Sequence, residues 1–137
     1  MTGEKCNITL SSKQALGPQT ETTTEEYTGA YIDRGTKRYL SYKRQTEEGY
    51  IDCLLSYGAN RLTMTQKGAV NSKMEFAPGR STTNLYDTPA GTLELTVYTR
   101  HMIIDHTGDM IKITLDYDLI AGGEPINTII DITVDLT

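Results

Sequence analysis

The longest regular pattern in the chain lies between Thr92 and Leu119, where apolar and polar residues alternate one by one. The alternation continues on both sides of a break at 106–109, with Leu93, Leu95 and Val97 before it and Ile111, Ile113, Leu115, Tyr117 and Leu119 after it. A period of two places apolar side chains on one face of a strand and polar ones on the other. The break contains Gly108 and Asp109, which favour a tight turn. We therefore predict a long antiparallel hairpin with one dry face.

Shorter segments with the same alternation fill the rest of the chain. Turn-forming Gly, Pro, Asn and Asp residues separate them, and no segment has the period of a helix. Gly29 lies inside one of these segments, which indicates a bulge or a sharp bend of the strand. Together with the hairpin they predict eight to ten strands, the others covering 5–16, 22–32, 37–44, 50–57, 62–68, 74–76, 81–88 and 130–136.

The short connections between these strands predict that neighbours in sequence pair with each other, as in an up-and-down meander. An open meander would leave two unpaired edges and one uncovered apolar face, and no helix is predicted to cover them. Closure of the sheet removes both problems. We therefore predict one all-β domain over residues 1–137, an up-and-down antiparallel barrel of eight to ten strands, with a two-sheet sandwich as the alternative. The interior of such a barrel is filled by side chains or holds one small ligand.

Composition and charge narrow the classes of function. The formal net charge is −5 and the isoelectric point is near 5.0, so we expect no nucleic-acid partner, because such binding depends on Lys and Arg. The start of the chain lacks the pattern of a secretory signal, and no apolar run is long enough to cross a bilayer. We expect a cytoplasmic protein without membrane contact. Cys6 and Cys53 lie in separate strands and are interpreted as free thiols.

Several strand and turn residues resemble those of a known bacterial family. They are Tyr39-Leu40-Ser41-Tyr42 with nearby Gly29, Phe76-Ala77-Pro78-Gly79, Ser81-Thr82, Tyr86, Gly91, Leu93-Glu94-Leu95, and Gly108-Asp109 followed by 113–119. In these residues the chain is similar to the YwiB-like proteins, a family of unknown function. The resemblance implies a calycin-like or lipocalin-like β-barrel, and it implies no activity.

The sequence contains no strong catalytic or metal-binding signature. His101, Asp105, His106 and Asp109 are the only cluster with metal-ligand chemistry, but the second half of this cluster falls in the predicted hairpin turn. There is no nucleophile elbow, no phosphate-binding Gly-rich loop and no metal-ligand spacing of Cys and His. We therefore expect no cofactor, no metal and no catalytic residue, and the sequence favours a binding protein over an enzyme.

Tyrosines on most strands suggest where a ligand would bind. A tyrosine inside a barrel combines an apolar ring with a hydroxyl that needs a partner, and the polar strand 81–88 would face the apolar hairpin. The predicted ligand-binding residues in the barrel interior are Tyr42, Thr82, Asn84, Tyr86, Leu95, Ile113 and Leu115. The first hypothesis is a small, partly apolar ligand held among them. The second is a filled barrel, monomeric or homodimeric, whose outer face with Tyr98 docks a protein partner.

Overall fold

Ten antiparallel strands close into a barrel in the computed structural model, which describes residues 3–88 and 90–137. Every strand pairs with its neighbours in sequence, and β1 pairs with β10 to complete the ring. The predicted up-and-down antiparallel barrel is therefore confirmed. The strands are β1 (Glu4–Leu16), β2 (Gln19–Asp33), β3 (Arg38–Thr46), β4 (Gly49–Tyr57), β5 (Leu62–Gly68), β6 (Asn71–Phe76), β7 (Ser81–Thr88), β8 (Gly91–Thr107), β9 (Met110–Ile120) and β10 (Ile126–Asp135). No helix in this part of the chain is long and apolar enough to cross a membrane.

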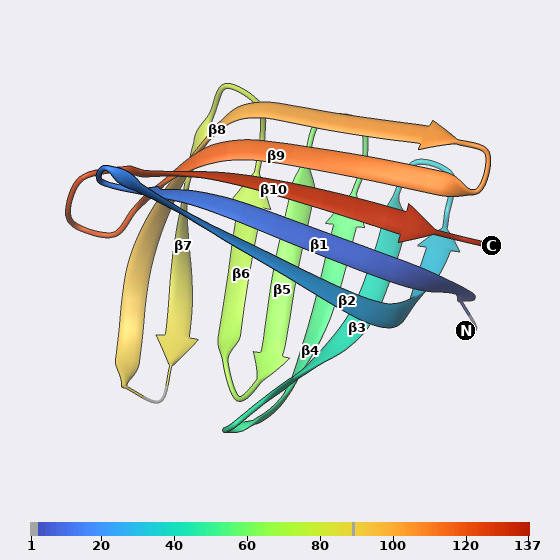
Figure 1. The fold of residues 1–137 in the computed structure, drawn as a ribbon, viewed down its shortest axis with the longest axis horizontal. Helices are drawn as coiled ribbons and strands as arrows, with labels where there is room; N and C mark the ends of the chain where they lie inside the picture. The colour runs from blue at the N-terminus through green and yellow to red at the C-terminus, as the bar shows by residue number, and fades with distance from the viewer. Residues whose placement is uncertain (1–2, 89) are drawn as a thin grey trace.

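The barrel is flattened into two layers whose strands cross. β9, β10, β1 and β2 run side by side in front, while β3 to β7 run across them behind (Figure 1). β8 belongs to both layers, because its first half pairs with β7 and its second half pairs with β9. The register of β8 shifts between Thr99 and His101, where the strand bends. The turn after β6 is fixed on this bend, since Gly79 N–H donates to Thr99 O at 2.8 Å and Thr99 N–H donates to Arg80 O at 3.1 Å.

Inward-facing residues of both layers fill the middle of the barrel. The phenyl ring of Phe76 packs edge-on against Tyr117 with ring centroids 4.9 Å apart. Leu93 is the exception in the predicted apolar face, because its side chain is 53% exposed where β8 begins at the open end of the barrel. The largest fully buried side chains are those of Ile8, Leu40, Leu55, Leu62, Phe76, Val97, Thr99, Ile111, Ile113, Leu115, Ile132 and Val134.

Two seams in the barrel are short. β2 pairs with β3 only through Gly29–Asp33, although β2 is 15 residues long. The register through Gly29 is regular, so of the two predicted alternatives the bulge is absent, and β2 and β3 separate below this residue. A Cβ atom on Gly29 would lie 2.2 Å from Ser41 O, which explains the glycine by close backbone approach. The second seam joins β6 and β7 through two residue pairs, Asn71 with Asp87 and Ser72 with Tyr86.

Candidate functional site

The apolar residues predicted to contact a ligand lie in the packed core. Ile113 and Leu115 are 1% and 0% exposed, and Leu95 is 7% exposed. Tyr42 is also buried, and its ring stacks on Tyr27 with centroids 4.8 Å apart. Core side chains therefore occupy the space beside the predicted apolar wall.

The polar residues predicted on the opposite wall connect two strands. Asn84 Oδ1 accepts a hydrogen bond from Glu75 N–H at 3.1 Å, and Thr82 Oγ1 donates to Glu75 O at 2.6 Å. Asn84 Nδ2 also donates to Thr82 O at 3.4 Å. These side chains replace the main-chain ladder where β6 and β7 separate. Tyr86 is half-buried at the paired end of the same seam, opposite Ser72.

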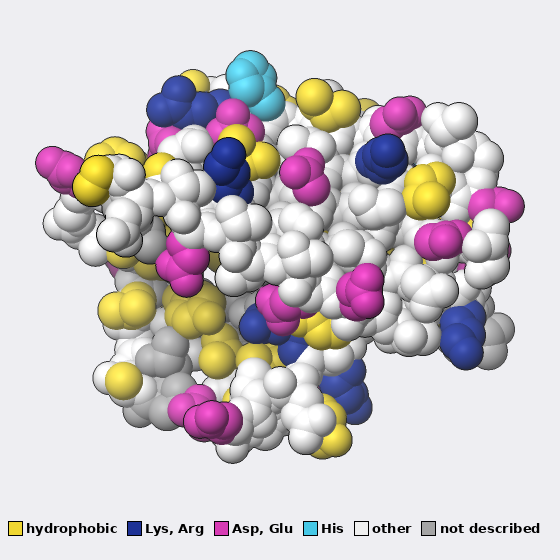
Figure 2. All heavy atoms as spheres, in the orientation of Figure 1, with side chains coloured by type: hydrophobic (Ala, Val, Ile, Leu, Met, Phe, Trp, Pro, Cys, Tyr) yellow, Lys and Arg dark blue, Asp and Glu magenta, His cyan; other side chains and the backbone are white. Residues whose placement is uncertain are grey.

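The interior becomes polar toward the open end of the barrel. Burial and the nearby Glu25 raise the pKa of Tyr27 to about 12, while the guanidinium of Arg44 acts in the opposite direction. Burial also raises the pKa of the Tyr42 hydroxyl and that of the Cys53 thiol. Figure 2 shows hydrophobic side chains lying in the hollow beneath the front layer. Both cysteines are free and buried, as expected.

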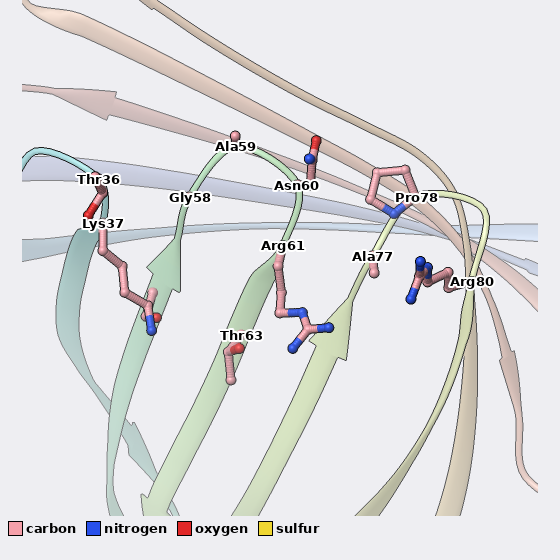
Figure 3. Close-up of a pocket in the computed structure, with 11 residues that line it drawn as sticks. Thr36, Lys37, Gly58, Ala59, Asn60, Arg61, Thr63, Ala77, Pro78 and Arg80 are labelled. Carbon is pink, nitrogen blue, oxygen red and sulfur yellow. The ribbon is translucent and has the colours of Figure 1, made fainter.

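A second concave surface lies on the outer wall, at the ends of β4, β5 and β6. This surface, called the cationic groove below, has a volume of about 610 Å³. Three different turns border it: the turn before β3, the β4–β5 turn and the β6–β7 turn (Figure 3). Its lining residues are Thr36, Lys37, Ser56, Gly58, Ala59, Asn60, Arg61, Thr63, Ala77, Pro78 and Arg80.

Lys37, Arg61 and Arg80 give the cationic groove its charge, one from each turn. Figure 3 shows the guanidinium groups of Arg61 and Arg80 directed toward one another past Ala77, with Lys37 on the far side of Arg61. Within the described parts of the chain, the ion pairs are Arg38–Asp33, Lys43–Asp52, Lys73–Glu75 and Arg100–Asp118. None of them includes a cation of the groove, whose lining contains no carboxylate.

The acidic groups near the cationic groove are already bound elsewhere. Asp33 accepts a hydrogen bond from Gly35 N–H at 2.8 Å and pairs with Arg38 at 3.5 Å. The hydrogen bond from Gly35 N–H is the main cause that holds the pKa of Asp33 below its usual value, and the positive charge of Arg38 acts in the same direction. Glu75 faces the same outer wall opposite Thr63 and pairs with Lys73 at 3.8 Å. The three cations therefore keep their charge available to a ligand.

Main-chain hydrogen bonds fix the turns that carry these cations. Lys37 O accepts from Arg34 N–H at 2.9 Å, Arg61 O accepts from Gly58 N–H at 3.0 Å, and Arg80 N–H donates to Ala77 O at 3.0 Å. Because the backbone is fixed in each turn, the groove is partly preorganised for a ligand.

The cationic groove was not among the predicted sites, because its cations lie far apart in sequence. Lys37 lies in one turn, and Arg61 and Arg80 are isolated in two others. The order of the strands in the barrel is the signal that could have predicted the cationic groove. In an up-and-down barrel alternate turns lie at the same end, so a cation in each of three alternate turns predicts a shared cationic surface.

Of the His and Asp residues that carry metal-ligand chemistry, His101, Asp105 and His106 lie in β8 and Asp109 lies in the turn that follows it. His106 packs edge-on to Tyr31 with ring centroids 6.3 Å apart. Over residues 3–88 and 90–137, no three His, Cys, Asp or Glu side chains are placed to share a metal ion. The prediction of a turn over 106–109 is correct only for Gly108 and Asp109, because β8 continues through Thr107 and His106 pairs with Ile111.

Comparison with known proteins gives the same fold and no activity. The chain is 29% identical over 97 residues to the uncharacterised β-barrel protein YwiB of Bacillus subtilis (strain 168), an alignment that covers 71% of this chain and 68% of the relative. The crystal structure of YwiB superposes with a TM-score of 0.89 at 23% identity, covering 96% of this chain and 91% of that one. The domain of unknown function DUF1934 matches residues 8–132. The chain therefore belongs to the DUF1934 family of β-barrel proteins, which confirms the predicted resemblance.

Proposed function

We propose that this barrel is a binding protein for a small ligand that carries a phosphate or carboxylate group, held in the cationic groove. The observation that carries the proposal is the convergence of Lys37, Arg61 and Arg80, which have no acidic partner in the described structure. Cations on a protein surface normally approach carboxylates or remain fully solvated. Here three of them border one concave surface, in a chain whose net charge is −5.

The chemistry of the lining favours an oxyanion. A guanidinium presents a planar fork of N–H donors that matches phosphate and carboxylate oxygens, and a lysine adds a point charge. Hydroxyl groups of Thr36, Ser56 and Thr63 provide further donors. Pro78 is exposed and offers an apolar surface for the rest of the ligand, beside the buried Ala77. The overall negative charge disfavours a long polyanion, so the ligand is a small molecule rather than a nucleic acid.

The cationic groove lacks the groups that would turn over a ligand. Its lining has hydroxyls and cations, but no His, Asp, Glu or Cys that could act as a general base. The proposal is therefore binding without catalysis.

Isothermal titration calorimetry with inorganic pyrophosphate at low ionic strength tests the proposal. We expect saturable binding that weakens with added salt, because exposed charges are screened. Arg61→Lys and Arg80→Lys should each weaken binding, because lysine keeps the charge and loses the fork. Lys112→Gln is the matched control for Lys37→Gln, because it removes the same charge from an exposed position on β9. Equal affinity in all four variants and the wild type would refute the groove as the site.

A ligand inside the barrel remains a second candidate. The observations in its favour are the half-buried Tyr86 opposite Leu93, which is 53% exposed, and the stacked rings of Tyr27 and Tyr42 on β2 and β3. Native mass spectrometry of protein purified from its own host would detect such a ligand as a mass lost on denaturation. Tyr86→Phe should reduce that retained mass, with Tyr98→Phe on the outer face as control. A bare mass for the wild-type protein would contradict the interior site.

A further inference from the structure

The edge of β2 is unpaired over most of its length. Below Gly29, β2 pairs with β1 on one side only, because β3 has separated from it. The side chains from Gln19 to Thr24 are exposed on both faces. A long strand edge of this kind is a template for pairing with another strand.

The hydrogen-bonding pattern identifies which backbone groups face the open side. Arg34 N–H donates to Lys37 O across the β2–β3 turn, so the backbone groups of Arg34 point away from β1. Groups on successive residues of a strand point to opposite sides, and the register of β2 with β1 is uninterrupted. The even-numbered residues Thr20, Thr22, Thr24, Glu26 and Thr28 therefore direct their N–H and C=O groups outward from the sheet edge.

An apolar hollow lies where the two strands separate. It has a volume of about 770 Å³, and its lining includes Thr28, Gly29, Ala30, Ser41 and Leu54. Leu54 is 39% exposed there. A strand added along β2 would begin beside this hollow, and its residue opposite Thr28 would project toward it.

We propose that the open edge of β2 binds an extended, basic peptide segment of a partner protein by strand addition. Main-chain hydrogen bonds to the even-numbered residues would supply affinity, and the apolar hollow would accept an anchoring side chain. This site shares no residue with the cationic groove and does not depend on its function.

The charges along β2 favour a basic segment at its open edge. From Gln19 to Thr28 the strand carries Glu21, Glu25 and Glu26 and no Lys or Arg. Lys13 on β1 lies opposite Thr22, and Arg44 on β3 acts on Glu25 across the opening. Lys43 and Lys67 line the hollow together with Asp52, at the Thr28 end of this edge.

A second copy of the chain brings no cation to this edge, because its own β2 carries no Lys or Arg from Gln19 to Thr28. A two-fold antiparallel pairing centred on Thr23 would also place Glu21 of one copy opposite Glu25 of the other, and like charges directly opposite destabilise a sheet. Pairings centred on Thr22 or Thr24 avoid this repulsion but leave the glutamates without a cation. An antiparallel peptide with Lys opposite Glu21, Glu25 and Glu26 supplies a cation to each of them.

The probe follows from this register. An acetylated and amidated peptide, Leu-Val-Lys-Lys-Thr-Val-Thr-Lys-Thr-Val, places Leu opposite Thr28 and its lysines opposite the three glutamates. The same peptide with Glu in place of Lys is the matched control. Binding is measured by fluorescence anisotropy and by NMR hydrogen exchange on the full chain. We expect the Lys peptide to bind and to protect the amides of the even-numbered residues from Thr20 to Thr28.

Two sets of variants test the edge itself. Thr22→Pro removes one outward N–H without removing a donor to β1, so the affinity for the Lys peptide should fall about five- to tenfold. Thr22→Val keeps this N–H and should leave the affinity unchanged. The double variant Glu21→Lys, Glu26→Lys should bind the Glu peptide more tightly than the Lys peptide. This variant keeps the test decisive if the proline variant fails to fold.

The outcomes separate the alternatives. Weakened binding in Thr22→Pro, reversed peptide preference in the lysine variant and protection of the even-numbered amides would each support strand addition. Equal binding of both peptides, or binding without amide protection, would overturn it. If neither peptide binds, the edge does not bind a basic peptide. The same conclusion holds if, without peptide binding, the protein forms a concentration-dependent dimer that protects the same amides.

Discussion

Asn84→Leu tests the side-chain link between β6 and β7. The sequence placed Asn84 among the predicted ligand-binding residues. In the structure Asn84 is 7% exposed and accepts the Glu75 N–H at 3.1 Å, at a seam where only two residue pairs form the main-chain ladder. Leucine has no acceptor, so the Glu75 N–H would face an apolar side chain.

The cost can be worked from these contacts. A buried donor left without a partner costs about 1–3 kcal/mol. The Asn84 Nδ2 bonds to Thr82 are long, at 3.3 and 3.4 Å, and their loss adds little. We therefore expect the free energy of unfolding to fall by about 2 kcal/mol. With an unfolding entropy of about 2.1 cal/mol/K per residue over 137 residues, this corresponds to a drop in Tm of about 7 °C.

Urea denaturation followed by circular dichroism, together with a thermal melt, measures the change. Thr83→Val is the control, because Thr83 is the neighbouring exposed residue on the same strand and should change stability by less than about 0.5 kcal/mol. An Asn84→Leu variant that unfolds at the wild-type urea concentration would refute the reasoning.

Three further changes follow from the structure. Gly29→Ala should destabilise the barrel by about 3 kcal/mol in a urea titration, because its Cβ would lie 2.2 Å from Ser41 O; wild-type stability would contradict this close approach. Leu115→Asp places a charge at a 0% exposed position and should abolish the cooperative thermal transition, so a folded variant would contradict the assignment of faces. Hydrogen bonds from Arg100 hold the pKa of Asp118 below its usual value, so the stability that this contact contributes is present above pH about 4 and is lost as the pH falls through the folded-state pKa. Urea midpoints measured across this range should depend less on pH in Arg100→Gln, and an unchanged slope would contradict the coupling.

The sequence predicted the barrel well because its strands follow one simple rule. Alternation identified the inward residues of the hairpin from Leu95 to Tyr117, and short turns required sequential pairing. The alternation could not reveal where neighbouring strands separate. Leu93 has the same period as Leu95, yet it lies beyond the filled part of the barrel, and only the three-dimensional path of β8 shows this.

The candidate sites were harder to predict because each depends on residues that are distant in sequence. Thr82 and Asn84 were correctly expected to share one face, but their partner is the backbone of Glu75, and side-chain to backbone bonds leave no pattern in the sequence. Lys37, Arg61 and Arg80 meet only because their turns share one end of the barrel. The order of the strands also determines which turns lie at the same end of the barrel, and this would have placed the three cations together.

The two short seams also shape how the barrel loses its structure. They divide the ring into one sheet of β3 to β6 and another of β7 to β10 with β1 and β2, and each sheet is continuously paired within itself. Separation of the two sheets requires the loss of five residue pairs at one seam and two at the other, together with the side-chain bonds of Asn84 and Thr82. It also opens the shared core, for example the contact of Phe76 with Tyr117, while every other ladder stays intact. Partial unfolding of this protein should therefore proceed by parting of two cooperative units, with hydrogen exchange fastest along the seams.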